Sequence, residues 1–391
     1  MGRKRKIGLI FSYNENWIAG SYYIMNLLEA INLHPAKNDY IIEIISDSDS
    51  FVKLKKFDFL SSKYLNLQDS TKLSFFERVF NFFSKKIIGK YIFDPQKSKK
   101  SIFGQKYDFI FPVVVRNYYL EFQKNAVFWI PDFQQHFLTT FFTEDEINDR
   151  NLNESNITEN ENFLVVSSQN AMNHMKQFYP FYKTKPFVLN FAVFHPEFQH
   201  IDSSLLKQKF NIDRPFYFSP NQFWAHKNHF TVLRALKLAV IKEKNILVVF
   251  SGKEKDYRNP DYFDKILEYV KQENLESHVR FLGFIDRAEQ LKLMDICKAV
   301  IQPSLFEGWS TVVEDVKAIN QFILLSDLEV HREQCTHNCE FFAPENHEQL
   351  SELMVKYFAL DITREIKDYS KNLYKFADDF FKIADTIIKN H

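Results

Sequence analysis

Residues 303–315 combine an acidic turn with the start of a helix. Glu307 is followed by Gly308-Trp309-Ser310-Thr311 and a helical pattern, and an apolar run at 299–301 precedes the turn. A helix start offers unpaired backbone N–H groups and the positive end of the helix dipole. Gly308, Trp309, Ser310 and Thr311 are therefore suited to hold a phosphate, while Glu307 accepts hydrogen bonds from hydroxyl groups. Together these residues predict a site for a sugar nucleotide.

The segment resembles the C-terminal half of retaining glycosyltransferases of family 4, which have the two-domain GT-B fold, and residues 322–333 continue the likeness. Those enzymes carry two glutamates separated by seven residues, so the second position falls on Asp315, which is one methylene shorter. Helix geometry agrees, because Asp315 flanks an apolar stripe of Val312, Val313, Val316 and Ile319. The same geometry predicts that Asp315 looks into a cleft and that Glu314 faces water.

A lysine at a predicted helix start indicates a bound anion. Residues 215–219 form a strand pattern, and Asn221, Gln222 and Lys227 follow it just before a helical pattern. A lysine there is unfavourable by ~0.3–1 kcal/mol unless an anion lies between it and the helix dipole. Lys227 therefore predicts a diphosphate. Relatives usually have an arginine five residues earlier, where this chain has the uncharged Gln222. The resemblance therefore implies that neutralisation of the leaving phosphate depends mostly on Lys227.

Polar residues also follow other predicted strands, as expected of parallel sheets that bind ligands beyond their carboxyl ends. Gly20 follows the first strand, at a helix start where backbone can approach a ligand, although Ala19 replaces a second glycine common in the family. The motif WIPDFQ at 129–134 resembles the motif of one subgroup of the family. The resemblance implies that Asp132, Gln134 or His136 contacts the sugar and the acceptor. Gly252 and the pair Phe284-Ile285 complete the predicted pocket, and the resemblance implies that the pair lies against the nucleobase. For single side chains in these loops, ordinary turns are the alternative.

The resulting assignment has two parts. The predicted catalytic residues are Lys227, Glu307, Asp132 and His136. The predicted donor-binding residues are Gly20, Asn221, Gln222, Gly252, Phe284, Ile285, Gly308, Trp309, Ser310, Thr311 and Asp315.

Short apolar runs alternate with helical patterns along the chain, which is typical of parallel sheets with crossover helices. We expect an α/β protein with two Rossmann-like domains, residues 1–194 on the acceptor side and 195–391 for the nucleotide sugar. Helices are expected from Asn346 onward, and the resemblance implies that the last one returns to the first domain. Strands are predicted at 7–12, 40–46, 107–114, 126–131, 163–167, 187–191, 215–219, 246–251, 279–282, 299–302 and 322–325.

Composition excludes several classes of protein. The 391 residues carry 50 basic and 50 acidic side chains, so nothing in the net charge indicates nucleic-acid binding. Three cysteines do not make a disulfide framework, and Cys335 and Cys339 lack the second cysteine pair of a structural zinc site. We expect no cofactor and no bound metal. The absence of a signal peptide pattern and of a long apolar run predicts a cytoplasmic protein.

One basic segment suggests a place for the acceptor. Between residues 72 and 100 there are eight lysines and arginines against Glu77 and Asp94, and an apolar stripe of Phe76, Val79, Phe80, Phe83 and Ile87. Basic amphipathic helices lie on anionic membranes, which would suit a lipid-linked or envelope saccharide acceptor at the inner face. A surface helix packed on the first sheet is the alternative.

The activity implied by the resemblance is transfer of a sugar from a nucleotide-diphosphate sugar to an acceptor hydroxyl, with retention at the anomeric carbon and without a metal. Cell-envelope polysaccharide or glycoconjugate synthesis is the expected setting. Two alternatives remain open. A sugar-nucleotide epimerase would use similar donor contacts, and a non-catalytic GT-B scaffold would account for Gln222 and Asp315.

Overall fold

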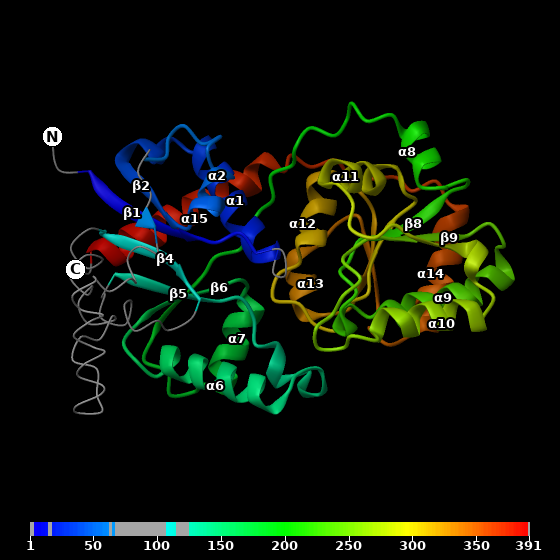
Figure 1. Cartoon of the computed structure of the whole chain (residues 1–391), viewed down its shortest axis with the longest axis horizontal. Coiled ribbons are helices and arrows are strands. Elements are labelled where there is room, and N and C mark those ends of the chain that lie inside the picture. Colours follow the sequence, from blue (N-terminus) through cyan, green and yellow to red (C-terminus); the bar gives the residue numbers. More distant parts are fainter. Residues whose placement is uncertain (1–3, 15–17, 62–64, 67–106, 115–124, 390–391) are drawn as a thin grey trace, which may run out of the picture.

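The computed structural model describes residues 4–14, 18–61, 65–66, 107–114 and 125–389. Two α/β units lie side by side, each built on its own parallel sheet (Figure 1). Within the described residues, the first sheet has seven strands in the order β3-β2-β1-β4-β5-β6-β7, and the second has six in the order β10-β9-β8-β11-β12-β13. This is the expected α/β architecture with two Rossmann-like units.

The first sheet consists of β1 (Arg5–Phe11), β2 (Tyr40–Ser46), β3 (Leu65–Asn66), β4 (Phe109–Val113), β5 (Ala126–Ile130), β6 (Phe163–Val166) and β7 (Lys185–Val188). Its helices are α1 (Ile18–Leu33), α2 (Ser48–Val52), α6 (Glu144–Thr158), α7 (Gln169–Phe178) and α15 (Ser370–Lys389), with 3-10 turns η2 (Pro35–Asp39), η3 (Gln134–His136) and η4 (Thr139–Phe141).

The second sheet consists of β8 (Phe216–Ser219), β9 (Leu247–Phe250), β10 (Val279–Phe281), β11 (Val300–Gln302), β12 (Ile323–Ser326) and β13 (Cys339–Phe342). Its helices are α8 (Ser203–Lys209), α9 (His229–Lys242), α10 (Tyr262–Gln272), α11 (Arg287–Ile296), α12 (Thr311–Ala318), α13 (Glu329–Gln334) and α14 (His347–Ala359), with 3-10 turns η5 (Ala225–Lys227) and η6 (Glu276–His278).

Both faces of the first sheet are covered, because neighbouring residues of its strands point to opposite faces. In β4, Phe109 and Phe111 join the core formed with α1 and α15, whereas Ile110 joins the core formed with α6 and α7. Val113 joins the same core as Ile110 because the strand register shifts between these two residues. A strand buried on both sides reads as a continuous apolar run, which is why β4 was recognisable in the sequence.

Helix α15 lies on the first sheet although it follows the second sheet in the chain (Figure 1). Its apolar stripe packs against α1 and β4, and Phe380 makes an edge-on contact with Phe109. The last helix of the chain therefore packs on the first unit. The buried side chains of α15 are Leu373, Phe376, Ala377, Phe380, Phe381, Ile383, Ala384 and Ile387.

The second sheet is covered in the same way. Helices α9, α10 and α14 pack on the face that carries Val248 and Phe250, while α8, α11 and α12 pack on the face that carries Phe218 and Val249. Parallel strands feeding helices on both faces leave the carboxyl ends of the strands open to a ligand.

The predicted strands agree with the structure to within a few residues, but β3 and β13 were missed. Strand β13 has only Phe342 fully buried, so its sequence, Cys-Glu-Phe-Phe, lacks the apolar run of a central strand. In the part of the chain that the structure describes, no helix is long and apolar enough to cross a membrane. The basic segment at 72–100 lies outside the described residues.

Candidate functional site

A pocket of about 270 Å³ lies between the two units. Its walls come from the first turn of α1, the turn after β5, and the loops that follow β8, β9, β10 and β11. The loops of the second sheet therefore meet the first unit at the edge where parallel sheets bind ligands. The predicted residues that line it are Gly20, Asp132, Asn221, Gln222, Lys227, Gly252, Phe284, Ile285, Glu307, Gly308, Trp309, Ser310, Thr311 and Asp315.

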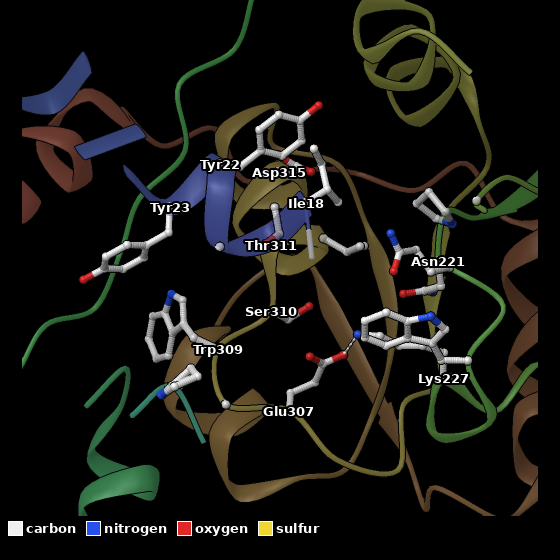
Figure 2. A pocket seen from close by; sticks show the side chains of 18 of the residues that line it. Ile18, Tyr22, Tyr23, Asn221, Lys227, Glu307, Trp309, Ser310, Thr311 and Asp315 are labelled. Carbon is white, nitrogen blue, oxygen red and sulfur yellow. Dashed lines mark hydrogen bonds and ion pairs between the residues drawn. The ribbon is translucent and has the colours of Figure 1, made fainter. Parts of the chain in front are cut away.

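Lys227 and Glu307 meet inside this pocket (Figure 2). Lys227 Nζ donates a hydrogen bond to Glu307 Oε1 at 2.6 Å, and both side chains are mostly buried. Burial alone would raise the pKa of the Glu307 carboxyl, but the Lys227 ammonium holds that pKa below its ordinary value. Glu307 is therefore a carboxylate at neutral pH, and the pair offers a ligand the Lys227 ammonium and one hydrogen-bond acceptor.

The start of α12 faces the same space. Ser310 caps the helix, because its hydroxyl accepts the N–H of Val313 at 3.4 Å. The Ser310 N–H is already bonded to Gln334 Oε1 at 3.0 Å, so it is not free to hold a phosphate as the sequence suggested. Thr311 and Val312 begin the helix, where N–H groups have no intrahelical acceptor, and both line the pocket.

Asp315 lies at the other end of the pocket and is fully buried. Its Oδ1 accepts hydrogen bonds from Arg287 and from His195, the latter at 2.9 Å. Burial would raise the pKa of this carboxyl, yet Arg287 and His195 lower it, so Asp315 is anionic. Asp315 does line the cleft, as expected, but its carboxylate is hydrogen-bonded to Arg287 and His195 in the free protein.

Glu314 does not face water, which corrects the helix-wheel expectation. Its side chain is buried, with hydrogen bonds from Lys317 at 2.7 Å and from Gln334 at 2.9 Å. Tyr369 also donates to its carboxylate. The helix pattern alone could not show that α13 and the segment before α15 cover this side of α12.

Asp132 comes from the first unit and completes the opposite wall. Burial raises the pKa of its carboxyl, and its Oδ1 accepts the N–H of Gln134 at 3.1 Å. Gly308 packs directly on this turn. A Cβ at Gly308 would lie 2.4 Å from the Pro131 carbonyl oxygen and 2.8 Å from Asp132 Cβ, so only glycine allows this approach between the two units.

His136 is not in the pocket lining, contrary to its predicted catalytic place. Its ring stacks on Phe178, with centroids 4.1 Å apart, and its Nε2 lies 3.2 Å from Glu154 Oε2. Tyr179 donates to the same oxygen at 2.9 Å. The 3-10 turn η3 directs His136 towards α6 and α7, and its contacts with Glu154 and Phe178 link these helices to the turn that carries Asp132.

Two further predicted donor-binding residues, Gly252 and Phe284, shape the loops of the second unit at the pocket. Gly252 has φ +155°, and a Cβ there would lie 2.1 Å from the Asn221 carbonyl oxygen, so the loops after β8 and β9 touch only because residue 252 is glycine. Phe284 is 68% exposed, leaving an apolar ring at the pocket rim that a planar base can cover.

Two sets of contacts fasten the units together beside the pocket. Trp309 Nε1 donates to the Phe191 carbonyl at 3.0 Å, across the boundary. On α13, the Glu333 carboxylate accepts the N–H groups of Gln169 and Asn170, at 2.8 and 2.9 Å, at the start of α7. A carboxylate at a helix N-terminus is stabilised by the helix dipole.

Sequence reasoning missed several pocket or pocket-facing residues. Arg287, Tyr22 and Trp224 line the cavity, and His195 reaches it through Asp315. Arg287 lies two residues after the predicted base loop, which is a signal that could have been followed. His195 comes from the segment between the two units, and no local pattern predicts its contact.

Comparisons with known proteins agree with this geometry. The profile of the family described as glycosyl transferases group 1 matches residues 202–376. The match spans most of the second unit, from α8 to the first turns of α15. A search of curated protein sequences found no match.

Solved structures share the fold of the whole chain. A glycosyltransferase from Rickettsia africae has a TM-score of 0.60 at 15% identity, covering 100% of this chain and 94% of that one. Anabaena HepE in complex with UDP and glucose has a TM-score of 0.61 at 14% identity, covering 99% and 98%. Sucrose-phosphate synthase from Thermosynechococcus elongatus has a TM-score of 0.60 at 14% identity, covering 98% and 95%. The two units together therefore have the GT-B fold.

Proposed function

We propose that this protein is a glycosyltransferase that moves a sugar from a nucleotide-diphosphate sugar to an acceptor hydroxyl. The group 1 profile match, the GT-B fold and the pocket between the sheets support this assignment. The observation that carries it is the buried Lys227–Glu307 pair, held inside the pocket beside the start of α12. To bind a nucleotide-diphosphate sugar, a site needs a cation beside the phosphates and a hydrogen-bond acceptor for the sugar hydroxyls, and this pair supplies both.

In this proposal the bond between the anomeric carbon and the β-phosphate oxygen breaks, and a bond to the acceptor oxygen forms. Negative charge develops on the leaving diphosphate. Lys227 and the first N–H groups of α12 would stabilise that charge, which they do best in a site closed to water. Glu307 would hold sugar hydroxyls, and the acceptor proton would pass to the leaving phosphate.

Asp315 and the base loop would bind the nucleoside. Because Asp315 is paired with Arg287, ribose hydroxyls would meet a carboxylate and a guanidinium together. Phe284 and Ile285 would cover the base. Asp132, on the wall contributed by the first unit, would face the sugar and the acceptor.

Retention at the anomeric carbon, independence of metal and a cell-envelope saccharide or lipid-linked acceptor are finer parts of the same proposal. They rest on the family 4 resemblance of the motif at 303–315. Contact of residues 72–100 with an anionic membrane is a separate hypothesis. Flotation with liposomes that contain or lack anionic lipid would test it, and absence of binding to both would reject it.

The direct test is a thermal-shift screen against UDP-, GDP-, ADP- and CDP-sugars, repeated with Lys227→Ala and Glu307→Ala. One nucleotide sugar should raise the Tm of the unaltered protein, since a ligand that binds only the folded state stabilises it. Both variants should lose the shift. No shift with any donor would contradict the proposal and favour a non-catalytic scaffold.

Turnover then separates the enzymes. A transferase releases nucleoside diphosphate faster when an acceptor saccharide is added, whereas an epimerase converts the donor alone. Product analysis by NMR of the new anomeric proton would decide between retention and inversion.

A further inference from the structure

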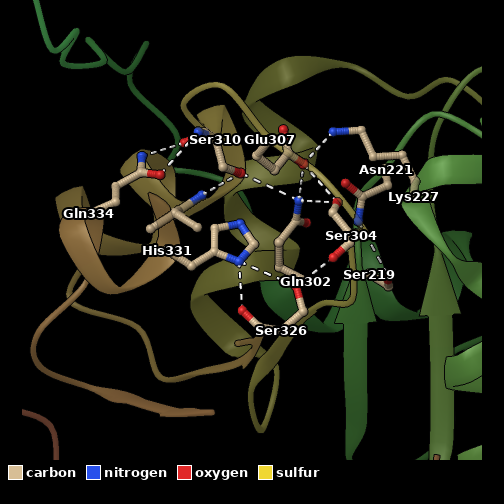
Figure 3. A network of polar contacts seen from close by, with 11 residues as sticks. Ser219, Asn221, Lys227, Gln302, Ser304, Glu307, Ser310, Ser326, His331 and Gln334 are labelled. Carbon is tan, nitrogen blue, oxygen red and sulfur yellow. Dashed lines mark hydrogen bonds and ion pairs between the residues drawn. The ribbon is translucent and has the colours of Figure 1, made fainter. Parts of the chain in front are cut away.

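The carboxylate of Glu307 is held by more than Lys227. Gln302 Nε2 donates to Glu307 Oε1 at 2.9 Å, and Ser304 Oγ donates to the same oxygen at 2.7 Å (Figure 3). Every hydrogen bond that the described part of the chain makes to this carboxylate falls on Oε1. Oε2 is thereby left for a ligand.

Gln302 is built into the structure for this contact. It is the last residue of β11 and fully buried, and its Nε2 also lies 3.0 Å from Ser304 Oγ and 3.4 Å from Ser310 Oγ. A carboxylate can only accept hydrogen bonds, so the amide nitrogen must face Glu307. The amide oxygen then has no partner among the described residues, which costs free energy. This orientation of the amide therefore leaves its oxygen unpaired while its nitrogen donates to Glu307.

We propose that Gln302, assisted by Ser304, is a positioning residue that keeps Glu307 aimed at the donor sugar once Lys227 turns to the phosphate. This inference rests on the proposed function. In the free protein, Lys227 is bonded to Glu307 at 2.6 Å, so a bound diphosphate competes for the same ammonium. Without neutral donors behind it, the Glu307 carboxylate would follow Lys227 and leave the sugar hydroxyls unpaired.

The rest of the network fixes these donors in place. Ser326 Oγ donates to the Ser304 carbonyl at 2.7 Å, and Gln334 Nε2 donates to the Ser310 carbonyl at 2.7 Å. His331 Nδ1 lies 2.8 Å from the Ser326 carbonyl. The strand end, the acidic turn and the start of α12 are thus tied together around Glu307, as Figure 3 shows.

The test compares binding of a nucleotide sugar with binding of its own nucleoside diphosphate, for example UDP-glucose and UDP, by calorimetry. The pair is taken from the donor that raises Tm most in the screen above. Gln302→Met keeps the side-chain volume and removes the donor. We expect the Kd of the nucleotide sugar to rise about tenfold while the Kd of the nucleoside diphosphate stays within about twofold.

The variant Gln302→Glu adds a second readout. Its carboxylic acid can donate to Glu307 only when protonated, and its carboxylate repels Glu307. Sugar-dependent affinity should therefore recover as the pH falls from about 8 to 6. A side chain with only a structural role would not give this pH profile.

Gln321→Met is the matched control. Gln321 is equally buried, and its Nε2 donates to the carbonyl groups of Met294 and Cys297, at 2.7 and 3.0 Å, away from the pocket lining. Its loss should lower Tm and leave both Kd values unchanged. If Gln302→Met does not fold, Ser304→Ala should show the same split between the two ligands.

The outcomes are distinct. Equal changes in both Kd values, or no change, in Gln302→Met or Ser304→Ala would overturn the positioning role and leave the proposed function standing. Failure of the unaltered protein to bind any nucleotide sugar of the panel would overturn both.

Discussion

Replacing Gly308 by alanine should prevent the two units from closing on the pocket. The added Cβ would lie 2.4 Å from the Pro131 carbonyl oxygen, about 1 Å inside the 3.4 Å at which ordinary contact begins. That oxygen belongs to backbone and cannot rotate away, so the units must separate. Overpacking of this kind costs about 1–3 kcal/mol. The backbone N–H of residue 308 remains, so phosphate contacts are not removed chemically.

The cost should appear in turnover, because each unit keeps its own sheet and core. A penalty of that size on the closed state lowers the rate about 5- to 150-fold. The assay is release of nucleoside diphosphate from the donor at saturation, with the radius of gyration measured by X-ray scattering. Gly8→Ala is the control, since its Cβ would meet Ile45 Cδ1 at 2.9 Å inside the first sheet. The control should lower Tm and keep turnover per folded molecule. Turnover within twofold of the unaltered protein, with unchanged scattering, would refute the reasoning.

Three further predictions concern charge. Asp132→Asn should raise Tm at pH 7–8: burial raises the pKa of Asp132, so its charged form destabilises the fold, and the gain should vanish towards pH 4, where the unfolded carboxyl also protonates. Asp315→Asn should lower Tm at pH 7 by the equivalent of about 1–3 kcal/mol, because the pKa of Asp315 is lowered in the folded protein and Arg287 loses its partner. This loss of stability should shrink as the pH falls through the lowered pKa. For either variant, a Tm equal to that of the unaltered protein at every pH would contradict the assignment. Donor turnover should survive treatment with EDTA, because Lys227 and the start of α12 supply the positive charge, and recovery only on adding Mg²⁺ would refute this.

The sequence predicted the parts of the site that follow strands directly. Gly252, Glu307 and Lys227 come two, five and eight residues after a strand end, so parallel topology brings their loops to one edge. The same logic failed for His136, because the 3-10 turn η3 rotates successive side chains through about 120° and directs this one at Glu154.

Contacts between distant segments were out of reach of sequence patterns. Glu314 looked exposed on a helical wheel, yet Tyr369, 55 positions further along the chain, donates to it. His195 and Arg287 both bond to Asp315, but they lie 120 and 28 positions away from it. Periodicity reports which face of a helix is apolar, and it does not report which polar face another segment will cover.

The position of α15 has a consequence for how this chain matures during synthesis. The first sheet is complete in sequence once β7 has emerged, but one of its apolar faces, including Phe109 and Phe111, waits for residues 370–389. About 180 residues of the second unit are made in between. A ribosome adding about 5–20 residues per second therefore leaves the part of that face that α15 covers exposed for roughly 10–40 seconds, and apolar surface exposed in this way favours aggregation.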